Sequence, residues 1–279
     1  MRSDVNHGKG ESSLRKQWWR AVERGGFGDG AAALTMLSQL RDRARVADAA
    51  DVVSLAWSTT GSLYRQSGRH DLAVGFDAAA LAELADPFGS TDPWVRVAAH
   101  DALVGLAADA LGRFRFDSSA RLLARARALV NTDTAVGNPA LGEWTAFVTK
   151  VRPLVRERWV GTELAICTGD GERGRRLIGE AQMMMSSVSP DHERHHIKTA
   201  LIAAAATEKA SEAYTVAKSC VNRAEAGGFV PLTWASTSLL HGLGDTSDTT
   251  IAGITRLHDM LVDRGMPFRR PPLDPSRPD

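Results

Sequence analysis

The sequence predicts an all-α fold, built as an irregular solenoid of antiparallel helix pairs. Apolar residues recur three and four positions apart through most of the chain, which is the spacing of one face of an α-helix. Alternation of β-branched and polar residues, the signal of a half-buried strand, is nearly absent. Short turns, several of which contain glycine, interrupt the helical pattern and divide it into pairs.

Four glycine-containing turns each separate a helix with large apolar anchors from a helix with small apolar residues. The turns are Gly25-Gly26-Phe27, Gly68-Arg69-His70, Gly112-Arg113-Phe114 and Gly169-Asp170-Gly171. Anchors such as Trp18 and Trp94 precede them, and small residues such as Ala73 and Ala126 follow. Glycine accommodates the left-handed backbone that closes a helix, and small residues allow two helices to approach closely.

The remaining chain continues the helical pattern with less regular turns. A fifth pair is expected over 192–206 and 211–226, where the turn between the two helices has no glycine. Pro231 suits the first turn of another helix, because proline is tolerated there. A last helix is expected over 249–264.

These elements define one helical domain with two irregular ends. We assign residues 14–266 to the helical-repeat domain and expect residues 1–13 to be disordered or frayed. Residues 267–279 contain five prolines and are expected to form an extended tail.

The glycine turn, the aromatic residue after it and the small residues of the second helix resemble the tetratricopeptide-repeat superfamily. The resemblance is clearest over 63–84 and 106–129 and covers about two thirds of the chain. Glycines 26, 68, 112 and 169 are 42, 44 and 57 residues apart, so the repeats are irregular. Segments 101–109 and 230–235 are similar to uncharacterised actinobacterial proteins of this architecture. The resemblance implies that the first helices of the pairs line a concave groove.

Composition favours a cytoplasmic protein without a strong global charge. The 34 basic and 33 acidic residues nearly cancel, so no overall attraction to nucleic acid or to anionic membranes is expected. The first residues lack the apolar core of a secretion signal, and no window is long and apolar enough to span a membrane. Cys167 and Cys220 are far apart in sequence and form no metal or redox motif.

Residues 192–196 match the His-Glu-x-x-His pattern of zinc hydrolases. On a helix, His192 and His196 would share one face and hold the metal, with Glu193 as the base. Asp191 suits a helix N-cap, so the motif also fits the first turn of an ordinary helix. A third ligand would have to come from a neighbouring helix, for example Glu225. We therefore predict that the match is accidental, with no metal ligands and no cofactor.

Arginine residues cluster in the third predicted pair. Residues 94–130 hold six basic and three acidic side chains, a net charge of +3. We name Arg113, Arg121 and Arg125 as candidate partner-binding residues, because guanidinium groups bind carboxylates and phosphates through forked hydrogen bonds. The alternative is a solvated helix face that pairs with the acidic segment 29–93.

The sequence contains no catalytic constellation, so we assign no catalytic residue. The leading hypothesis is a non-catalytic scaffold that binds an unidentified protein or peptide in the groove of the helical repeats. Two alternatives remain open: a zinc-dependent hydrolase using His192, Glu193 and His196, and an adaptor that senses a small ligand and passes the change to another protein.

Overall fold

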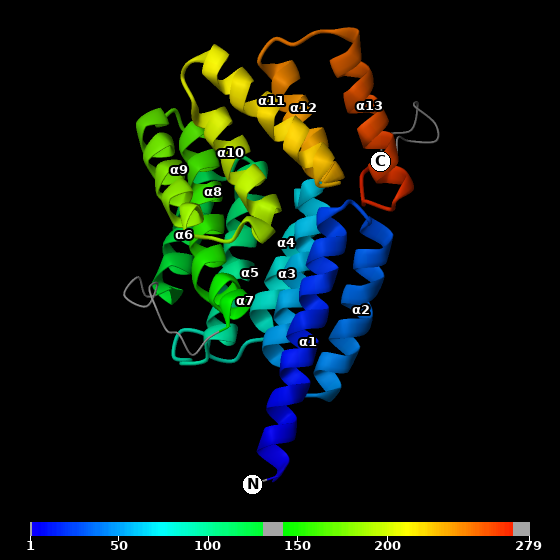
Figure 1. Ribbon diagram of the computed structural model, residues 1–279. Helices are drawn as coiled ribbons and strands as arrows, with labels where there is room; N and C mark the ends of the chain where they lie inside the picture. The colour runs from blue at the N-terminus through cyan, green and yellow to red at the C-terminus, as the bar shows by residue number, and fades with distance from the viewer. Residues whose placement is uncertain (1, 131–141, 270–279) are drawn as a thin grey trace, which may run out of the picture.

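Twelve helices of 13 residues or more dominate the residues that the computed structural model describes, which are 2–130 and 142–269 (Figure 1). They are α1 (Arg2–Gly26), α2 (Gly30–Val46), α3 (Ala50–Gln66), α4 (His70–Ala82), α5 (Pro93–Gly112), α6 (Phe116–Leu129), α8 (Arg152–Cys167), α9 (Gly171–Ser186), α10 (Glu193–Ala206), α11 (Ala210–Ala226), α12 (Val230–Gly242) and α13 (Asp248–Asp263). A short helix α7 (Glu143–Ala146) and a π-helical segment (Phe147–Val151) lead into α8. No strand occurs in the described ranges, so the prediction of an all-α fold is confirmed.

The helices pack mainly against their neighbours in sequence, which is consistent with antiparallel pairs. Each pair expected from the sequence is present, from α1 with α2 to α10 with α11. The first helix of a pair is the more buried one: α5 buries fourteen residues, whereas α6 buries four. The large apolar side chains of the first helices therefore form the centre of the molecule, and the second helices cover them from outside.

The prediction that Gly68 and Gly112 lie at or beside turns between paired helices is confirmed. Gly68 is in the turn after α3 and has a φ of +72°, as expected for a left-handed helix end. Gly112 is the last residue of α5, but the left-handed position there belongs to Phe114, with a φ of +58°. Glycine is needed at 112 for another reason, since a Cβ atom would lie 2.4 Å from the Nε2 atom of His70.

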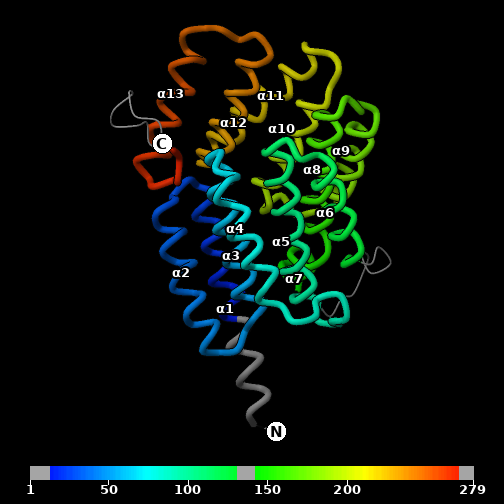
Figure 2. The backbone as a smooth tube through the Cα atoms, turned by 180° about the vertical axis from the view of Figure 1, so that it is seen from behind, coloured from blue at the N-terminus to red at the C-terminus, as the bar shows by residue number. Residues whose placement is uncertain are grey.

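The turn between α1 and α2 contacts the last two helices of the chain. The Ala31 amide donates a hydrogen bond to the carbonyl oxygen of Arg264, with 2.9 Å between nitrogen and oxygen. Phe27 stacks on Phe229, with ring centroids 5.4 Å apart. Figures 1 and 2 both show α12 and α13 beyond the ends of α1 and α2. The turn after α1 and the last two helices therefore lie against each other.

The predicted ends of the helical domain, at 14 and 266, stay a prediction. Helix α1 begins at Arg2 and so includes most of segment 1–13, for which fraying was expected. A helix anchored by the buried Trp18 can extend toward its N-terminus, because each added residue adds a backbone hydrogen bond. Residues 266–269 are irregular, and the rest of the expected proline-rich tail lies outside the described residues. Among the described helices, none combines the length and the hydropathy needed to cross a membrane.

Candidate ligand-binding cavities

A cavity of about 580 Å³ lies on the concave side of the stack, and we call it the concave cavity. Its walls come from the first helices of successive pairs, α3, α5, α8, α10 and α12, together with residues at the end of α13. The groove that the repeat resemblance implied stays a prediction. The sequence suggested the groove but named none of the residues that line it.

The walls of the concave cavity combine apolar surface with several cations. Trp159, Leu232 and Trp234 provide large apolar faces. The indole N–H of Trp234 is buried and has no hydrogen-bond partner among the described residues. A ligand in this cavity would therefore meet both apolar contacts and unused hydrogen-bonding capacity.

Lys198 is one of two cations of this wall, with Arg194, that make no ion pair within the described residues. Its Nζ atom lies 5.3 Å from the ring centroid of Trp159 and makes no ion pair within the described part of the chain. Burial lowers the pKa of Lys198; Glu163 opposes this effect, while Arg194 and Arg156 add to it. A carboxylate beside Lys198 would be favoured, because it would neutralise a partly desolvated cation.

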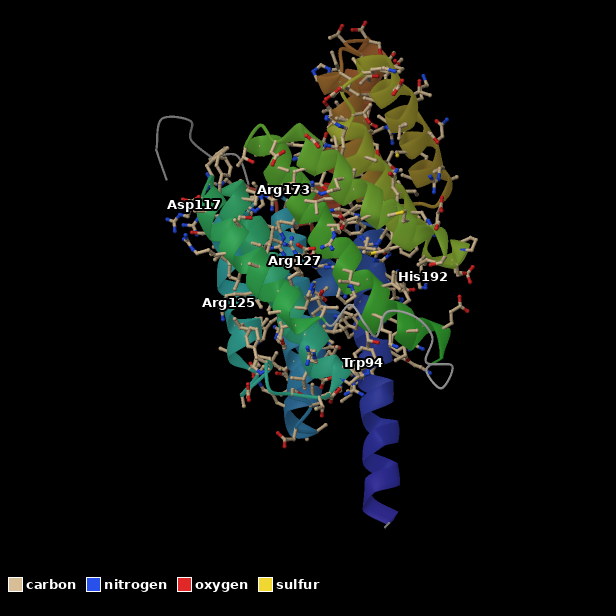
Figure 3. All side chains as sticks on the ribbon, turned by 90° about the vertical axis from the view of Figure 1, so that its left-hand side faces the viewer. Trp94, Asp117, Arg125, Arg127, Arg173 and His192 are labelled. Atoms are coloured by element: carbon tan, nitrogen blue, oxygen red, sulfur yellow. The ribbon has the colours of Figure 1, made fainter. Side chains whose placement is uncertain are left out.

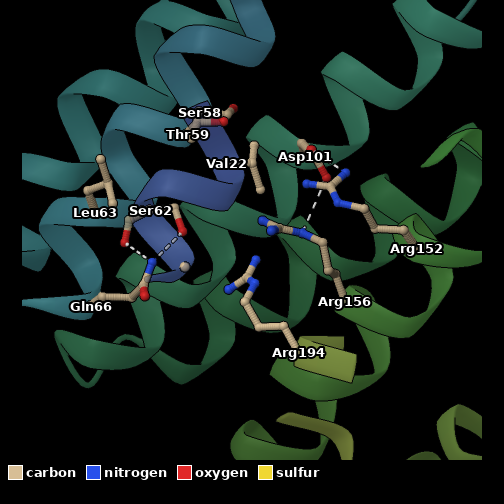
Figure 4. Close-up of a pocket in the computed structure, with 12 residues that line it drawn as sticks. Val22, Ser58, Thr59, Ser62, Leu63, Gln66, Asp101, Arg152, Arg156 and Arg194 are labelled. Carbon is tan, nitrogen blue, oxygen red and sulfur yellow. Dashed lines mark hydrogen bonds and ion pairs between the residues drawn. The ribbon is translucent and has the colours of Figure 1, made fainter. Parts of the chain in front are cut away.

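A smaller polar space of about 30 Å³ adjoins the concave cavity, and we call it the arginine recess. Arg152, Arg156 and Arg194 converge on it from α8 and α10, as Figure 4 shows. Among the described residues, Asp101 of α5 is the only carboxylate that lines the recess: its oxygens lie 2.8 Å from Arg152 Nη1 and 3.3 Å from Arg156 Nε. Arg194 makes no hydrogen bond or ion pair within the described residues.

A second buried charge cluster links α3, α4 and α5, and we call it the acid-rich cluster. Arg65 Nη1 lies 2.8 Å from an Asp77 oxygen and 2.7 Å from an Asp109 oxygen. The Nδ1 atom of His70 lies 3.2 Å from Asp109. Burial raises the pKa of Asp77 to about 7; Arg65 opposes this rise and Asp109 adds to it. Two members of this cluster, Arg65 and His70, line the concave cavity.

The three side chains of the His-Glu-x-x-His motif do not converge. The His192 ring stacks on Phe147 with centroids 3.6 Å apart, and Glu193 forms a paired hydrogen bond with Arg223 at 2.8 and 3.0 Å. The Nε2 atom of His196 lies 3.3 Å from the carbonyl oxygen of Ser189.

The contact with Arg223 shows that the end of α11 does approach the motif, as the alternative required, but it supplies a cation rather than a third ligand. Glu225, the third ligand considered from the sequence, is exposed. Across 13–130 and 142–269, where side chains are described, no group of three or more His, Cys, Asp or Glu side chains is arranged to hold a metal ion.

The arginines singled out in the sequence lie outside the concave cavity. Arg113 is in the turn after α5, while Arg121 and Arg125 are on α6, and all three are exposed. Figure 3 shows Arg125 on α6 at the opposite side of that view from His192. Arg121 donates a hydrogen bond to Ser118 Oγ at 3.2 Å, and the Arg125 guanidinium lies 5.8 Å from the ring centroid of Phe88. The expected exposure of Arg121 and Arg125 is confirmed, while their role in binding stays a prediction.

The buried arginines and Lys198 were missed by sequence reasoning, although a signal was present. Arg152 and Arg156 are four residues apart on α8, and Arg194 and Lys198 are four residues apart on α10. Such spacing places both charges of a pair on one helix face. Both helices are first helices, whose faces are the more buried ones, so these charges mark a polar interior.

A third space, of about 450 Å³, lies near the N-terminal end of α10. Trp19, Trp144 and His192 line it, and Arg194 and His195 also border one or both of the other two spaces. The three spaces therefore meet around Arg194.

Comparison with known proteins does not assign this architecture to a family. The described residues establish an all-helical chain whose helices pack with their sequence neighbours, and the type of repeat remains an expectation. No protein-family model matches the chain, and no curated protein matches it.

Proposed function

We propose that this protein is a non-catalytic binding module, an irregular tetratricopeptide-like stack that receives a segment of a partner protein in the concave cavity. The observation that supports this function is Lys198, which makes no ion pair within the described residues and lies over the ring of Trp159, in a cavity that Trp234 also lines. A cavity of about 580 Å³ accommodates a few side chains rather than a whole helix. The segment that fits best carries an acidic residue next to an aromatic or aliphatic one.

Charge complementarity is the reason for an acidic segment. Arg65 faces two carboxylates, and Arg156 shares Asp101 with Arg152, whereas Lys198 and Arg194 have no ion-pair partner in the described chain. Glu163 is the one carboxylate that lines the concave cavity. An incoming carboxylate would therefore reduce the excess of positive charge, and an incoming lysine would increase it.

Selection from a library of short random peptides tests this proposal. Peptides that bind the immobilised protein are expected to be enriched in Asp or Glu beside an aromatic residue. Their affinity should fall at least tenfold for Lys198→Gln and should weaken as salt rises, because exposed charge interactions are screened. The matched control is Lys218→Gln, which changes an exposed lysine on the outer helix α11.

Two results of that selection would overturn the proposal. The first is the absence of any enriched sequence, and the second is enrichment of peptides whose affinity is the same for Lys198→Gln and Lys218→Gln. If selected peptides respond instead to the double substitution Arg121→Gln and Arg125→Gln, the exposed face of α6 is the binding surface and the concave cavity is not.

The ligand-sensing adaptor would use the same cavity for a small anionic molecule. A volume of about 580 Å³ lies within the range of small-molecule sites, which is the observation in its favour. A small-molecule ligand would raise the melting temperature and displace the selected peptides. The hydrolase alternative has less support, because His192, Glu193 and His196 are engaged with three different neighbours.

A further inference from the structure

We infer that the arginine recess is a binding site for one small oxyanion group, either a carboxylate or the head of a phosphate or sulfate. The site goes beyond the proposed function, because a free ion can fill it without any partner protein. Its charged residues come from α5, α8 and α10, and α1 and α3 supply the rest of its lining.

The first argument is the excess of positive charge around a small space. Three guanidinium groups face one carboxylate, and the side chains of Arg152 and Asp101 are each only 3% exposed. Leaving charges buried without a partner is strongly unfavourable, so a second anion would stabilise the arrangement. Arg194, which lacks a partner of its own, borders the space directly.

Loss of a proton does not relieve this excess. Burial lowers the pKa of Arg156 to about 10, with Asp101 opposing, and burial lowers the pKa of Arg194 to about 10, with Glu23 opposing. Both values lie above neutral pH, so the guanidinium groups remain charged. Compensation must therefore come from outside the three side chains.

The second argument is the hydrogen-bonding capacity that the protein leaves unused. Arg152 Nη1 and Arg156 Nε are buried and have no well-aligned hydrogen-bond acceptor among the described residues, although Asp101 is close to both. Planar guanidinium groups donate in pairs to the oxygens of carboxylates and phosphates. The two groups on α8 and the third on α10 thus offer donors from two directions, as Figure 4 shows.

The third argument is size and access. One water molecule needs about 10–15 Å³ measured with a water-sized probe, so the recess, at about 30 Å³, suits one oxyanion group and excludes a nucleotide. Ser62, Gln66, Arg156 and Arg194 line both the recess and the concave cavity, so the two spaces adjoin. An anion can enter from the cavity as a free ion, or as a carboxylate of a bound segment. Only the second source depends on the proposed function.

Thermal unfolding in phosphate, sulfate and acetate tests the free ion, with chloride as the reference anion at constant ionic strength. The parent protein should show a saturable rise in melting temperature with phosphate or sulfate. Arg194→Met should lose this rise and keep only the small, non-saturable increase that such salts give to most proteins. Arg121→Met, which removes an exposed arginine on α6, should behave as the parent does.

Two further measurements make the result decisive. If Arg194→Met does not fold by circular dichroism, Arg194→Lys replaces it; this variant keeps the charge but loses the forked geometry, and should bind phosphate at least tenfold more weakly. Competition then separates the sources: phosphate that displaces a selected acidic peptide identifies the peptide carboxylate as an occupant, and simultaneous binding identifies a free ion.

The inference is overturned if the parent, Arg121→Met and the Arg194 variant respond equally to every anion and bind acidic peptides equally. A different result would contradict the proposed function. If phosphate binding depends on Arg194 but no peptide is selected, the oxyanion site stands and the peptide-binding proposal is wrong.

Discussion

The acid-rich cluster and the arginine recess both border the concave side of the helix stack, but they carry opposite excess charge. The acid-rich cluster sets Arg65 against Asp77 and Asp109. The recess sets Arg152, Arg156 and Arg194 against Asp101. Each cluster draws its members from at least two helices, and its carboxylates are buried.

The two clusters differ in how the imbalance can be relieved. A buried carboxylate can take up a proton, and Asp77, with its pKa raised to about 7 chiefly by burial, does so near neutral pH. A guanidinium group keeps its proton under the same conditions. An excess of acid is therefore corrected within the protein, whereas an excess of arginine calls for an external anion.

The largest expected effect comes from breaking the acid-rich cluster with Arg65→Met. This change leaves Asp77 and Asp109 buried without their cation and should lower the free energy of unfolding by about 3–5 kcal/mol. Urea denaturation measures it. The control Arg45→Met removes the largely exposed pair with Glu83 and should cost less than about 1 kcal/mol. Equal losses in the two variants would mean that the cluster is not a buried ion network.

The next effect is a pH dependence assigned to Asp77. Because its folded pKa lies above the ordinary carboxyl value of 3.8, its contribution is fully present below that value and is lost as pH rises through about 7. The stability of the parent minus that of Asp77→Asn should therefore fall between about pH 4 and 7, by an amount on the order of a few kcal/mol. Urea denaturation at a series of pH values gives this difference.

The stabilities of two proteins must be compared, because the contribution of His100 to stability changes with pH in the opposite sense to that of Asp77. Burial lowers the pKa of His100 to about 4, so its contribution is lost as pH falls through that value. His100 is present in the parent and in Asp77→Asn, and its effect cancels in the comparison. A difference that stays constant from pH 4 to 7 would show that Asp77 is ionised throughout.

A smaller effect is expected from Gly105→Ala, which tests how tightly the acid-rich cluster is packed. The new Cβ atom would lie 2.3 Å from Asp77 Oδ1, so the buried carboxylate must shift, at a cost of about 1–3 kcal/mol. Gly75→Ala is the matched control on α4, since nothing lies within 4 Å of its Cβ position. That substitution should stabilise the helix by about 0.5–1 kcal/mol. Thermal unfolding of both variants gives the comparison, and a stabilising Gly105→Ala would contradict the tight packing.

The smallest expected effect is that of Arg194→Met, which compares the arginine recess directly with the acid-rich cluster. In chloride buffer without oxyanions, Arg194→Met should change the stability by less than about 1 kcal/mol or increase it, because it removes a buried charge that has no partner. Arg65→Met and Arg194→Met both delete an arginine from the concave side, yet only the first should destabilise strongly. A loss of about 3 kcal/mol or more for Arg194→Met would show that Arg194 already has a compensating anion in the protein itself.

Helix pairing was predictable because its signals are local. The apolar spacing around Trp18, the glycine at 68 and the small residues of α4 act within one or two helical turns, so they can be read without knowing the tertiary structure. The assignment of glycine 112 shows the limit of this reading. Its place beside a turn was correct, but its physical role depends on His70, which belongs to another helix pair.

The candidate site was only partly predictable. The concave side was expected from the resemblance to helical repeats, and Arg121 and Arg125 were correctly expected to be exposed. The dense arginine run and the short histidine motif are conspicuous in a linear sequence. The charged residues that line the cavity occur singly or four apart within otherwise apolar helices, which makes them inconspicuous.

The sequence by itself determined that this chain forms paired helices and where the pairs turn, because these properties depend on neighbours within a few residues. Only the tertiary structure decided which charges meet. Asp101 is more than 50 residues from Arg152 and Arg156, and Arg194 lies further along the chain. Their convergence depends on the angle and order in which α5, α8 and α10 stack. Those quantities are set by the packing of whole helix surfaces, and no local pattern encodes them.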